Sequence, residues 1–294
     1  MIDIPTLEDD GLITPEIGSW GVEKYKHVAL YSSVFIRSMR KIWECLVYID
    51  LFSGAGRSRI RGTNRIIPAS PLIALGLAQK FDKYIFCDKD RKKYDALGKR
   101  IKRSFAACDV SLINGDANSM IEEMLSLIPQ YSGTFRVLSF CFADPYSFGN
   151  LFFSTIRKLS KIFMDFLILI PSGMDATRNL RKYLSSESPK LDNFLGRTDW
   201  RELWKLEERQ SITFERFVIK EFSKSMKGLD LIDPGLDSTV LIHSDEKKLF
   251  LYRLVLYSRR ELGNTFWKEI KKCLDPQREL TFPNKQKYVT AFFY

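Results

Sequence analysis

Short apolar runs alternate along this chain with segments of helical periodicity, and this alternation limits the folds that the chain can adopt. The run LVYIDLFSGAG, which starts at Leu46, is followed by a predicted helix over about 71–80. YIFCD, VSLIN, RVLSFCFADPYSFG and DFLILIPSG repeat the arrangement further along the chain. Strand-to-helix alternations with this spacing favour right-handed crossovers. The pattern therefore predicts an α/β protein with a mainly parallel sheet and helices on both faces.

The segments outside these alternations predict additions to the sheet. Apolar residues from Tyr25 to Trp43 recur at helical spacing, so residues 1–45 are interpreted as an N-terminal helical extension packed on the core. Residues 174–227 are a predicted helical insertion after the fifth strand. STVLIHS and LFLYRLVLYS predict an antiparallel hairpin with its turn at 245–248, and the helix TFWKEIKKCL follows. On this division, residues 46–294 form one domain that contains the insertion.

The charge and cysteine content exclude several classes of protein. Lys and Arg number 46 against 36 Asp and Glu, and the formal net charge of +10 fits a polyanionic partner. The five cysteines form no CxxC pair, so we expect neither a metal site nor a disulfide framework. No apolar run approaches the roughly 18 residues that span a bilayer, and the acidic N-terminus does not resemble a secretion signal. We therefore expect a soluble, cytoplasmic protein with no membrane partner.

Acidic residues end four of the predicted strands: Asp50, Asp88, Asp116 and Asp144. Ligands of open parallel sheets bind beyond the carboxyl ends of the strands, and an acid at the position of Asp88 commonly binds ribose hydroxyls. Gly54 and Gly56 let the backbone approach a ligand. A GxGxxG loop would need a small residue at Arg59, so an adenosine-containing cofactor other than a dinucleotide is favoured. The glycines also suit a tight turn that binds nothing, and Asp88 also suits the first turn of the next helix.

The ordered motifs YIDLFSGAG, YIFCD, NGDA and DPY, followed by the terminal hairpin, resemble those of class I S-adenosylmethionine-dependent methyltransferases. More narrowly, the chain resembles the three-Cys-motif partner (TcmP) family over most of its length, through ASPLIAL, ADPYSFG, GRTDWREL and LFLYRLVLYSRRELGNTFWKEI. The resemblance implies a Rossmann-like, seven-stranded, mainly parallel sheet with a terminal antiparallel hairpin. It also implies S-adenosylmethionine as the cofactor. The cofactor-binding residues that it implies are Asp50, Phe52, Gly54, Gly56, Asp88, Asp116 and Ala117.

The turn Asp144-Pro145-Tyr146 resembles the (Asp/Asn)-Pro-Pro-(Tyr/Phe) turn of amino methyltransferases. In that turn the acid and a backbone carbonyl hold the target amine while the aromatic ring stacks on a base, so catalysis depends on positioning and electrostatics. One proline stands here in place of two, which makes Phe148 an alternative stacking ring, and the turn also suits an ordinary structural role. Cys141 lies inside a predicted strand without a Pro-Cys context, which argues against methylation at cytosine carbon five.

Basic residues gather in two places near the predicted strand ends. Arg57, Arg59, Arg61 and Arg65 lie on an inserted loop next to the proposed cofactor residues and are candidates for binding nucleic-acid phosphate. The second set is interpreted as a solvated helix face: Lys92, Lys93, Lys99, Arg100, Lys102 and Arg103. His27 and His243 are expected to be packing or surface residues, and the cysteines to be small buried apolar side chains.

The leading functional hypothesis is a methyltransferase that modifies an amino group in nucleic acid. The first alternative is a cofactor-binding subunit that needs a partner, because the family name implies a three-Cys-motif protein that supplies iron–sulfur or radical chemistry. The second alternative is a nucleic-acid-binding module whose catalytic turn has decayed. The insertion at 174–227 is the candidate region for recognising the acceptor.

Overall fold

The computed structural model describes residues 3–185, 188–210, 212–244 and 249–274. The chain divides into two compact units, which are Met1–Phe142 with the segment that begins at Thr265, and Ala143–Asn264. The predicted domain boundary after residue 45 stays a prediction. None of the described helices combines the length and the apolar character needed to cross a membrane.

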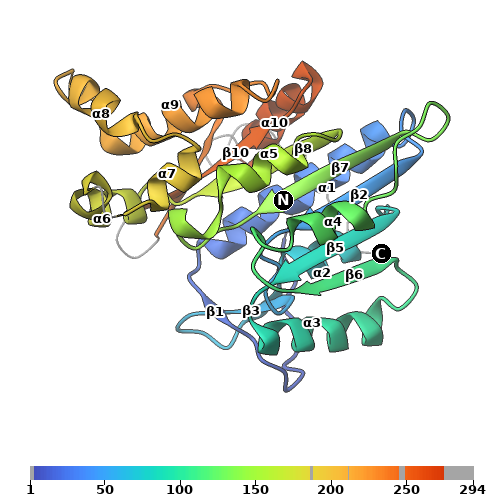
Figure 1. The fold of residues 1–294 in the computed structure, drawn as a ribbon. Coiled ribbons are helices and arrows are strands. Elements are labelled where there is room, and N and C mark those ends of the chain that lie inside the picture. The colour runs from blue at the N-terminus through green and yellow to red at the C-terminus, as the bar shows by residue number, and fades with distance from the viewer. Residues whose placement is uncertain (1–2, 186–187, 211, 245–248, 275–294) are drawn as a thin grey trace. The chain divides into compact units, whose positions relative to one another are not determined.

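Parallel strands form the centre of the first unit, in the order β6-β5-β2-β7 (Figure 1). They are β2 (Cys45–Asp50), β5 (Lys83–Asp88), β6 (Val110–Asn114) and β7 (Val137–Ala143). Every residue of β2 and β7 is buried, which explains their continuous apolar runs in the sequence. The register sets Asp50 opposite both Phe86 and Phe142, and it sets Asp88 opposite Asn114, so the carboxyl ends of the strands lie at one edge.

Five helices accompany these strands: α1 (Gly21–Met39), α2 (Ser70–Gly76), α3 (Arg91–Ser104), α4 (Ile121–Leu127) and α10 (Glu261–Leu274). The side chain of Asp90 caps α3 by accepting hydrogen bonds from the backbone N–H groups of Lys92 and Lys93. Aromatic rings join α1 to the sheet, with Tyr31 and Phe35 lying 5.0 and 5.5 Å from Phe140. Trp267 of α10 packs 6.1 Å from Tyr31 on the same face.

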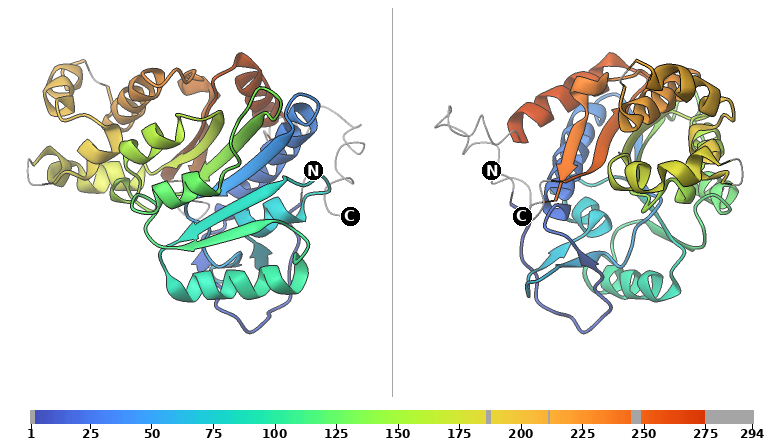
Figure 2. Two further views of the ribbon diagram at one scale, coloured as in Figure 1. Left: turned by 45° about the vertical axis from the view of Figure 1, so that its right-hand side comes forward. Right: turned by 90° about the vertical axis from the view of Figure 1, so that its left-hand side faces the viewer.

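The segment 57–69, predicted to be an inserted loop, contains a hairpin of β3 (Arg57–Ile60) and β4 (Ile66–Pro68). β1 (Glu16–Ile17) pairs in parallel with β3, which completes a small separate sheet. We call residues 3–17 the acidic strap, and Figure 2 shows this segment beside the small sheet and near α3. Ile4 anchors the strap in an apolar cluster that includes Ile60, Ile67 and Ile73.

Antiparallel pairing dominates the second unit, where β10 (Phe250–Tyr257) lies between β8 (Met164–Ile170) and β9 (Val240–His243). The region 174–227 contains α6 (Met174–Leu184), α7 (Lys190–Leu195), α8 (Trp200–Glu208) and α9 (Phe214–Lys227). Before β8 lie the short helices η1 (Phe148–Asn150) and α5 (Phe153–Leu159), and η2 (Leu236–Ser238) precedes β9. The predicted turn at 245–248 lies outside the described residues.

The strand order of the large sheet is β6-β5-β2-β7-β8-β10-β9. It has seven strands, and β10 is antiparallel to both of its neighbours. The predicted fold class is therefore confirmed: a Rossmann-like, mainly parallel sheet with a terminal antiparallel hairpin and a helical insertion after its fifth strand.

Candidate functional site

The loop that follows β2 is held between the two neighbouring strands. Leu51 donates its backbone N–H to the carbonyl of Phe142 in β7 at 3.1 Å, and Ser53 donates to the carbonyl of Cys87 in β5 at 2.9 Å. Asp50 is fully buried and accepts a hydrogen bond from the N–H of Phe52 at 3.1 Å. The chain after β2 is thus fixed at the carboxyl edge of the sheet, where the sequence predicted a ligand.

Asp88 connects the loop after β2 to the start of α3. We call this loop, residues 51–56, the glycine loop. Its Oδ2 accepts from the N–H of Gly54 and its Oδ1 accepts from the N–H of Asp90, both at 2.8 Å. A carboxylate has about four lone-pair sites, so the half-buried Asp88 retains capacity to accept from a ligand. Gly54 has a φ of +63°, and a side chain added there would meet no atom within 4 Å. The backbone beside Asp88 therefore faces open space.

The third predicted acid lies directly beyond β6. Asn114 donates its side-chain amide to the carbonyl of Asp88 at 2.9 Å, which ties the end of β6 to the end of β5. Asp116 follows in a turn where its Oδ1 accepts from the backbone and side-chain N–H groups of Asn118, at 2.9 and 3.0 Å. Asp116 is half-buried and Ala117 is buried. Asp50, Asp88 and Asp116 thus end three adjacent strands of the first unit.

These acids lie close to the thiol of Cys87. Burial raises the pKa of Cys87 to about 12, and the negative charges of Asp88, Asp116 and Asp50 contribute to the increase. The thiol donates to the carbonyl of Gly115 at 3.3 Å. Three carboxylates therefore act together on one group, and the field at this edge of the sheet favours positive charge.

The predicted catalytic turn belongs to the second unit. Asp144 is half-buried, Pro145 is buried and the Tyr146 side chain is 86% exposed. Phe148 is fully buried, with its ring 4.8 Å from Phe194, so the alternative stacking ring is committed to packing. The catalytic assignment of Asp144, Pro145 and Tyr146 stays a prediction.

Asp175, which sequence reasoning did not identify, supports that turn. Its Oδ2 accepts from the backbone N–H of Phe148 at 2.9 Å, and its Oδ1 accepts from Asn179 and from the Tyr183 hydroxyl, both at 2.7 Å. The only sequence signal for this role is an acid in the first turn of α6. Asp175 connects the chain after Asp144 to the helical insertion.

The four candidate arginines face the acidic strap. Ion pairs join Arg57 to Asp10 at 3.4 Å, Arg59 to Asp9 at 2.6 Å, Arg61 to Glu16 at 3.9 Å and Arg65 to Asp3 at 3.7 Å. Arg57 and Arg65 also donate to the backbone carbonyls of Glu8 and Ile4. The proposed phosphate-binding role of these arginines stays a prediction, and any anion that bound them would compete with the strap.

Arg100 departs from the predicted solvated helix face, because its side chain is almost fully buried. Its guanidinium donates to both carboxylate oxygens of Asp10, at 2.8 and 2.7 Å, and to the carbonyl of Ala55 in the glycine loop at 2.6 Å. This contact lowers the pKa of Asp10 to about 2, mainly through the hydrogen bonds from Arg100. The sequence placed Arg100 correctly on α3 but on the wrong side, because the strap that covers it is far away in the chain.

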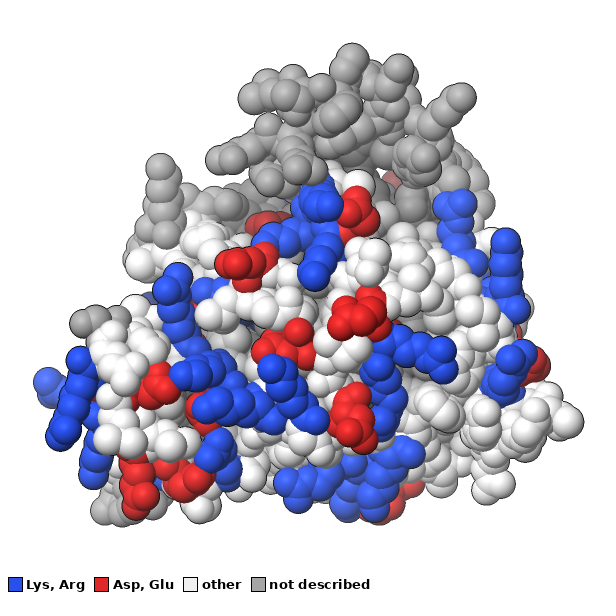
Figure 3. Space-filling view, turned by 90° about the horizontal axis from the view of Figure 1, so that it is seen from above, with Lys and Arg blue, Asp and Glu red and all other residues white. Residues whose placement is uncertain are grey.

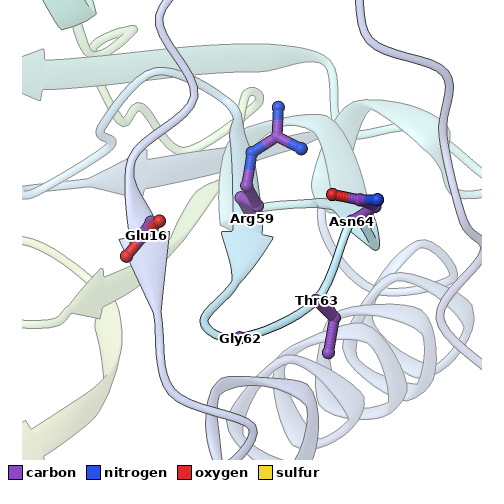
Figure 4. Close-up of a pocket in the computed structure, with 5 residues that line it drawn as sticks. All are labelled: Glu16, Arg59, Gly62, Thr63 and Asn64. Carbon is purple, nitrogen blue, oxygen red and sulfur yellow. The ribbon is translucent and has the colours of Figure 1, made fainter.

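A shallow, open hollow of about 470 Å³ lies on the small sheet, lined by Glu16, Arg59, Gly62, Thr63 and Asn64. Figure 4 shows Glu16 on β1 beside Arg59 on β3, with the turn of Gly62, Thr63 and Asn64 at the end of the hairpin. Arg59 is the cation in this lining, and its guanidinium already pairs with Asp9. An anion in the hollow would therefore have to compete with Asp9 for Arg59.

The remaining candidate groups show little reactivity. Burial raises the pKa of Cys141, which lies inside β7, well above its ordinary value, and this supports the argument against a cysteine nucleophile. Cys45 and Cys87 are also buried, whereas Cys108 is half-buried and Cys273 is exposed, so the expectation of buried cysteines is wrong for these two. Within the described part of the chain, no group of three or more His, Cys, Asp or Glu side chains is placed to hold a metal ion.

Comparisons with known proteins give structural likenesses only. No family model matches the sequence, and no curated protein matches it. Among solved structures, protein LPL1258 from Legionella pneumophila has 11% identity and a TM-score of 0.47, with 85% of this chain and 90% of that chain covered. The O-methyltransferase TomG from Streptomyces achromogenes, in complex with SAM, has 9% identity and a TM-score of 0.44, with 81% of each chain covered.

Trm1 from Pyrococcus horikoshii, in complex with S-adenosyl-L-methionine, has 11% identity and a TM-score of 0.43, with 90% of this chain and 61% of that chain covered. The resemblance to the TcmP family and the expected cytoplasmic location stay predictions.

Proposed function

We propose that this chain is an S-adenosylmethionine-dependent methyltransferase and that its acceptor is an amino group in nucleic acid. One observation carries the proposal: Asp50 and Asp88 end adjacent strands around a glycine loop, Asp116 lies in the turn just beyond the next strand, and the three acids make the field at this edge negative. A cationic sulfonium group complements such a field. The net charge of +10 supports a polyanionic acceptor.

The residues at this edge fit an adenosyl cofactor. Asp88 has lone pairs left for ribose hydroxyls after it accepts from Gly54 and Asp90. The open space at Gly54 allows close approach of a ligand to the backbone. Asp50 orients the N–H of Phe52, and the turn at Asp116 and Ala117 is the expected border of the adenine ring.

When bound, the cofactor would supply a methyl group on a positively charged sulfur. The lone pair of the acceptor nitrogen would form the new N–C bond, the S–C electrons would stay on sulfur, and the nitrogen would release its proton to water. In this proposal Asp144 and the carbonyl of Pro145 orient the amine. The exposed Tyr146 ring stacks on the base that carries it. The chain contributes by positioning these groups and by its fixed charges.

Calorimetric titration of the full chain with S-adenosylmethionine tests the cofactor site. We expect binding by the wild type and a Kd about 10- to 100-fold weaker for Asp88→Asn, because charged hydrogen bonds contribute about 1.5–3 kcal/mol. Asp109→Asn is the matched control, since that exposed carboxylate pairs with Lys83 at 3.0 Å. Absence of binding heat from folded wild-type protein would contradict the proposal.

Transfer of a labelled methyl group to RNA or DNA separates catalysis from binding. We expect Asp144→Ala to abolish transfer while S-adenosylmethionine still binds. Transfer by this variant at the wild-type rate would exclude Asp144 as the group that holds the amine.

A further inference from the structure

Cations without acidic partners line the exposed side of α3. The side chains of Lys92, Lys99, Lys102 and Arg103 are exposed, and none forms an ion pair with another described residue. At 3.6 residues per turn, the four side chains project within an arc of about 100°. We call these four residues the α3 cationic row.

The rest of the α3 charge is already paired or buried. Arg91 pairs with Asp95 at 3.0 Å, Lys93 lies 3.8 Å from Asp90, and Arg100 is buried against Asp10. Asp95 is the acid on the exposed side of α3, and its charge is taken up by Arg91. The four cations of the α3 cationic row therefore form no ion pair within the described part of the chain, and the row has an excess of positive charge.

The basic surface of the β3–β4 hairpin differs from this row. Each arginine of the β3–β4 hairpin faces a carboxylate of the acidic strap. On the face shown in Figure 3, red acidic side chains lie among the blue basic ones. Isolated or paired surface charges contribute little to binding, whereas several free cations on one helix face attract a polyanion.

The shape of the row fits a single strand of phosphates. Lys92, Lys99 and Arg103 lie within about 40° of one another around the helix, so they form a narrow line rather than a broad patch. Lys92 and Arg103 are eleven residues apart, which corresponds to about 16 Å along the axis. The row begins four residues after Asp88, at the end of α3 next to the proposed cofactor site.

We propose that the α3 cationic row binds one phosphodiester strand of a nucleic acid and leads it toward the carboxyl edge of the sheet. This proposal rests on the proposed function only for the identity of the strand as the methyl acceptor. Phosphate contacts of this kind position a nucleic acid without reading its sequence. The binding is therefore electrostatic and depends steeply on salt concentration.

Fluorescence anisotropy with a labelled single-stranded RNA oligonucleotide and the full chain tests the row. The variant carries Lys92→Gln, Lys99→Gln, Lys102→Gln and Arg103→Gln, since glutamine keeps helix propensity and removes the charge. We expect a Kd at least about tenfold weaker at about 0.1 M salt, and a plot of log K against log salt whose slope is shallower by about 3.

The matched control removes the same net charge from exposed cations elsewhere: Lys41→Gln, Lys205→Gln, Arg209→Gln and Lys268→Gln. We expect its salt slope to change by less than about 1. Equal losses in the two variants, no loss in the α3 variant, or no RNA binding by the wild type would each overturn the proposal. Preference for duplex over single-stranded nucleic acid would overturn the single-strand geometry.

Titration of the same variants with S-adenosylmethionine keeps the two proposals apart. An unchanged cofactor Kd in the α3 variant, together with lost RNA binding, is the expected result. If the wild type binds RNA through the α3 cationic row but binds no S-adenosylmethionine, the proposed RNA-binding role of the row is supported and the proposed methyltransferase function is wrong.

Discussion

Gly54 and Gly56 lie in the same loop, and both have positive φ, but they meet different surroundings. The φ angles are +63° and +82°. A Cβ atom at Gly56 would lie 2.7 Å from Leu97 and 3.1 Å from Leu72, whereas one at Gly54 would meet no atom within 4 Å. Gly56 is therefore required by packing against α2 and α3, and Gly54 keeps backbone accessible beside Asp88.

We expect Gly56→Ala to lower the free energy of unfolding more than Gly54→Ala does. The left-handed backbone costs either alanine about 1 kcal/mol, and overpacking adds about 1–3 kcal/mol at position 56 only. Urea denaturation of the two variants measures the difference. Equal losses of stability would show that the Leu97 and Leu72 side chains move aside without cost.

At the level of elements, the acidic strap forms part of the first unit rather than a loose terminus. β1 pairs with β3, Leu7 bridges to Ile66, and Ile4 is buried in the apolar cluster. Arg100 adds a charged anchor that reaches both Asp10 of the strap and Ala55 of the glycine loop. The strap and the proposed cofactor loop are thus held by the same guanidinium.

We expect Ile4→Ala to loosen the strap, since a cavity at a buried isoleucine costs about 2–5 kcal/mol. Amide hydrogen exchange provides an internal comparison. The N–H groups of Arg59 and Arg61 donate to the strap carbonyls of Pro15 and Ile17, so their exchange should accelerate. The N–H of Ile60 bonds to Arg65 within the hairpin and should change less.

The matched control for this experiment is Ile13→Ala, because Ile13 lies in the same strap but is 42% exposed. Its exchange pattern should resemble that of the wild type. Uniform acceleration of all three amides in Ile4→Ala would mean that the strap and the hairpin open together.

At the level of the whole molecule, one histidine links stability to pH. The His27 side chain is 2% exposed, and its ring centroid lies 5.7 Å from that of Trp267. Burial lowers the pKa of His27 to about 4. The expectation that it is a packing residue agrees with this environment. Between about pH 6.5 and pH 4, the unfolded chain binds a proton at this position that the folded protein excludes.

We therefore expect the free energy of unfolding to fall by about 3 kcal/mol as the pH decreases from about 6.5 to about 4. Denaturation curves across this range should show a shallower dependence in His27→Gln. His243→Gln is the control, since the chain has two histidines and His243 is exposed. If the free energy of unfolding depends on pH in the same way in His27→Gln and in the wild type, the prediction is wrong and the effect comes from carboxylates. Below about pH 4 the unfolded chain takes up a proton at Asp10, so the stability that the contact with Arg100 provides should decrease until about pH 2, where the folded carboxyl is protonated as well.

The sequence by itself determined the order and type of the main elements, because both depend on local periodicity. Continuous apolar runs gave β2 and β7, amphipathic spacing predicted α1 and α3, and a polar break predicted the terminal hairpin. The acids at the strand ends were also predictable, since β-strand termini in an α/β sheet are fixed by the alternation itself. The predicted boundaries were less accurate, and α1 spans Gly21–Met39 rather than 25–43.

Only the tertiary structure decided which charges are free. In the sequence alone, five arginines cannot be distinguished from the lysines of α3: Arg57, Arg59, Arg61, Arg65 and Arg100. In the structure all five pair with acids of the strap, whereas the α3 cationic row does not. Asp175 and Phe148 likewise acquire their roles from residues distant in the chain. The physical reason is that periodicity is a property of neighbouring residues, whereas the pairing of charges depends on segments that folding brings together from far apart.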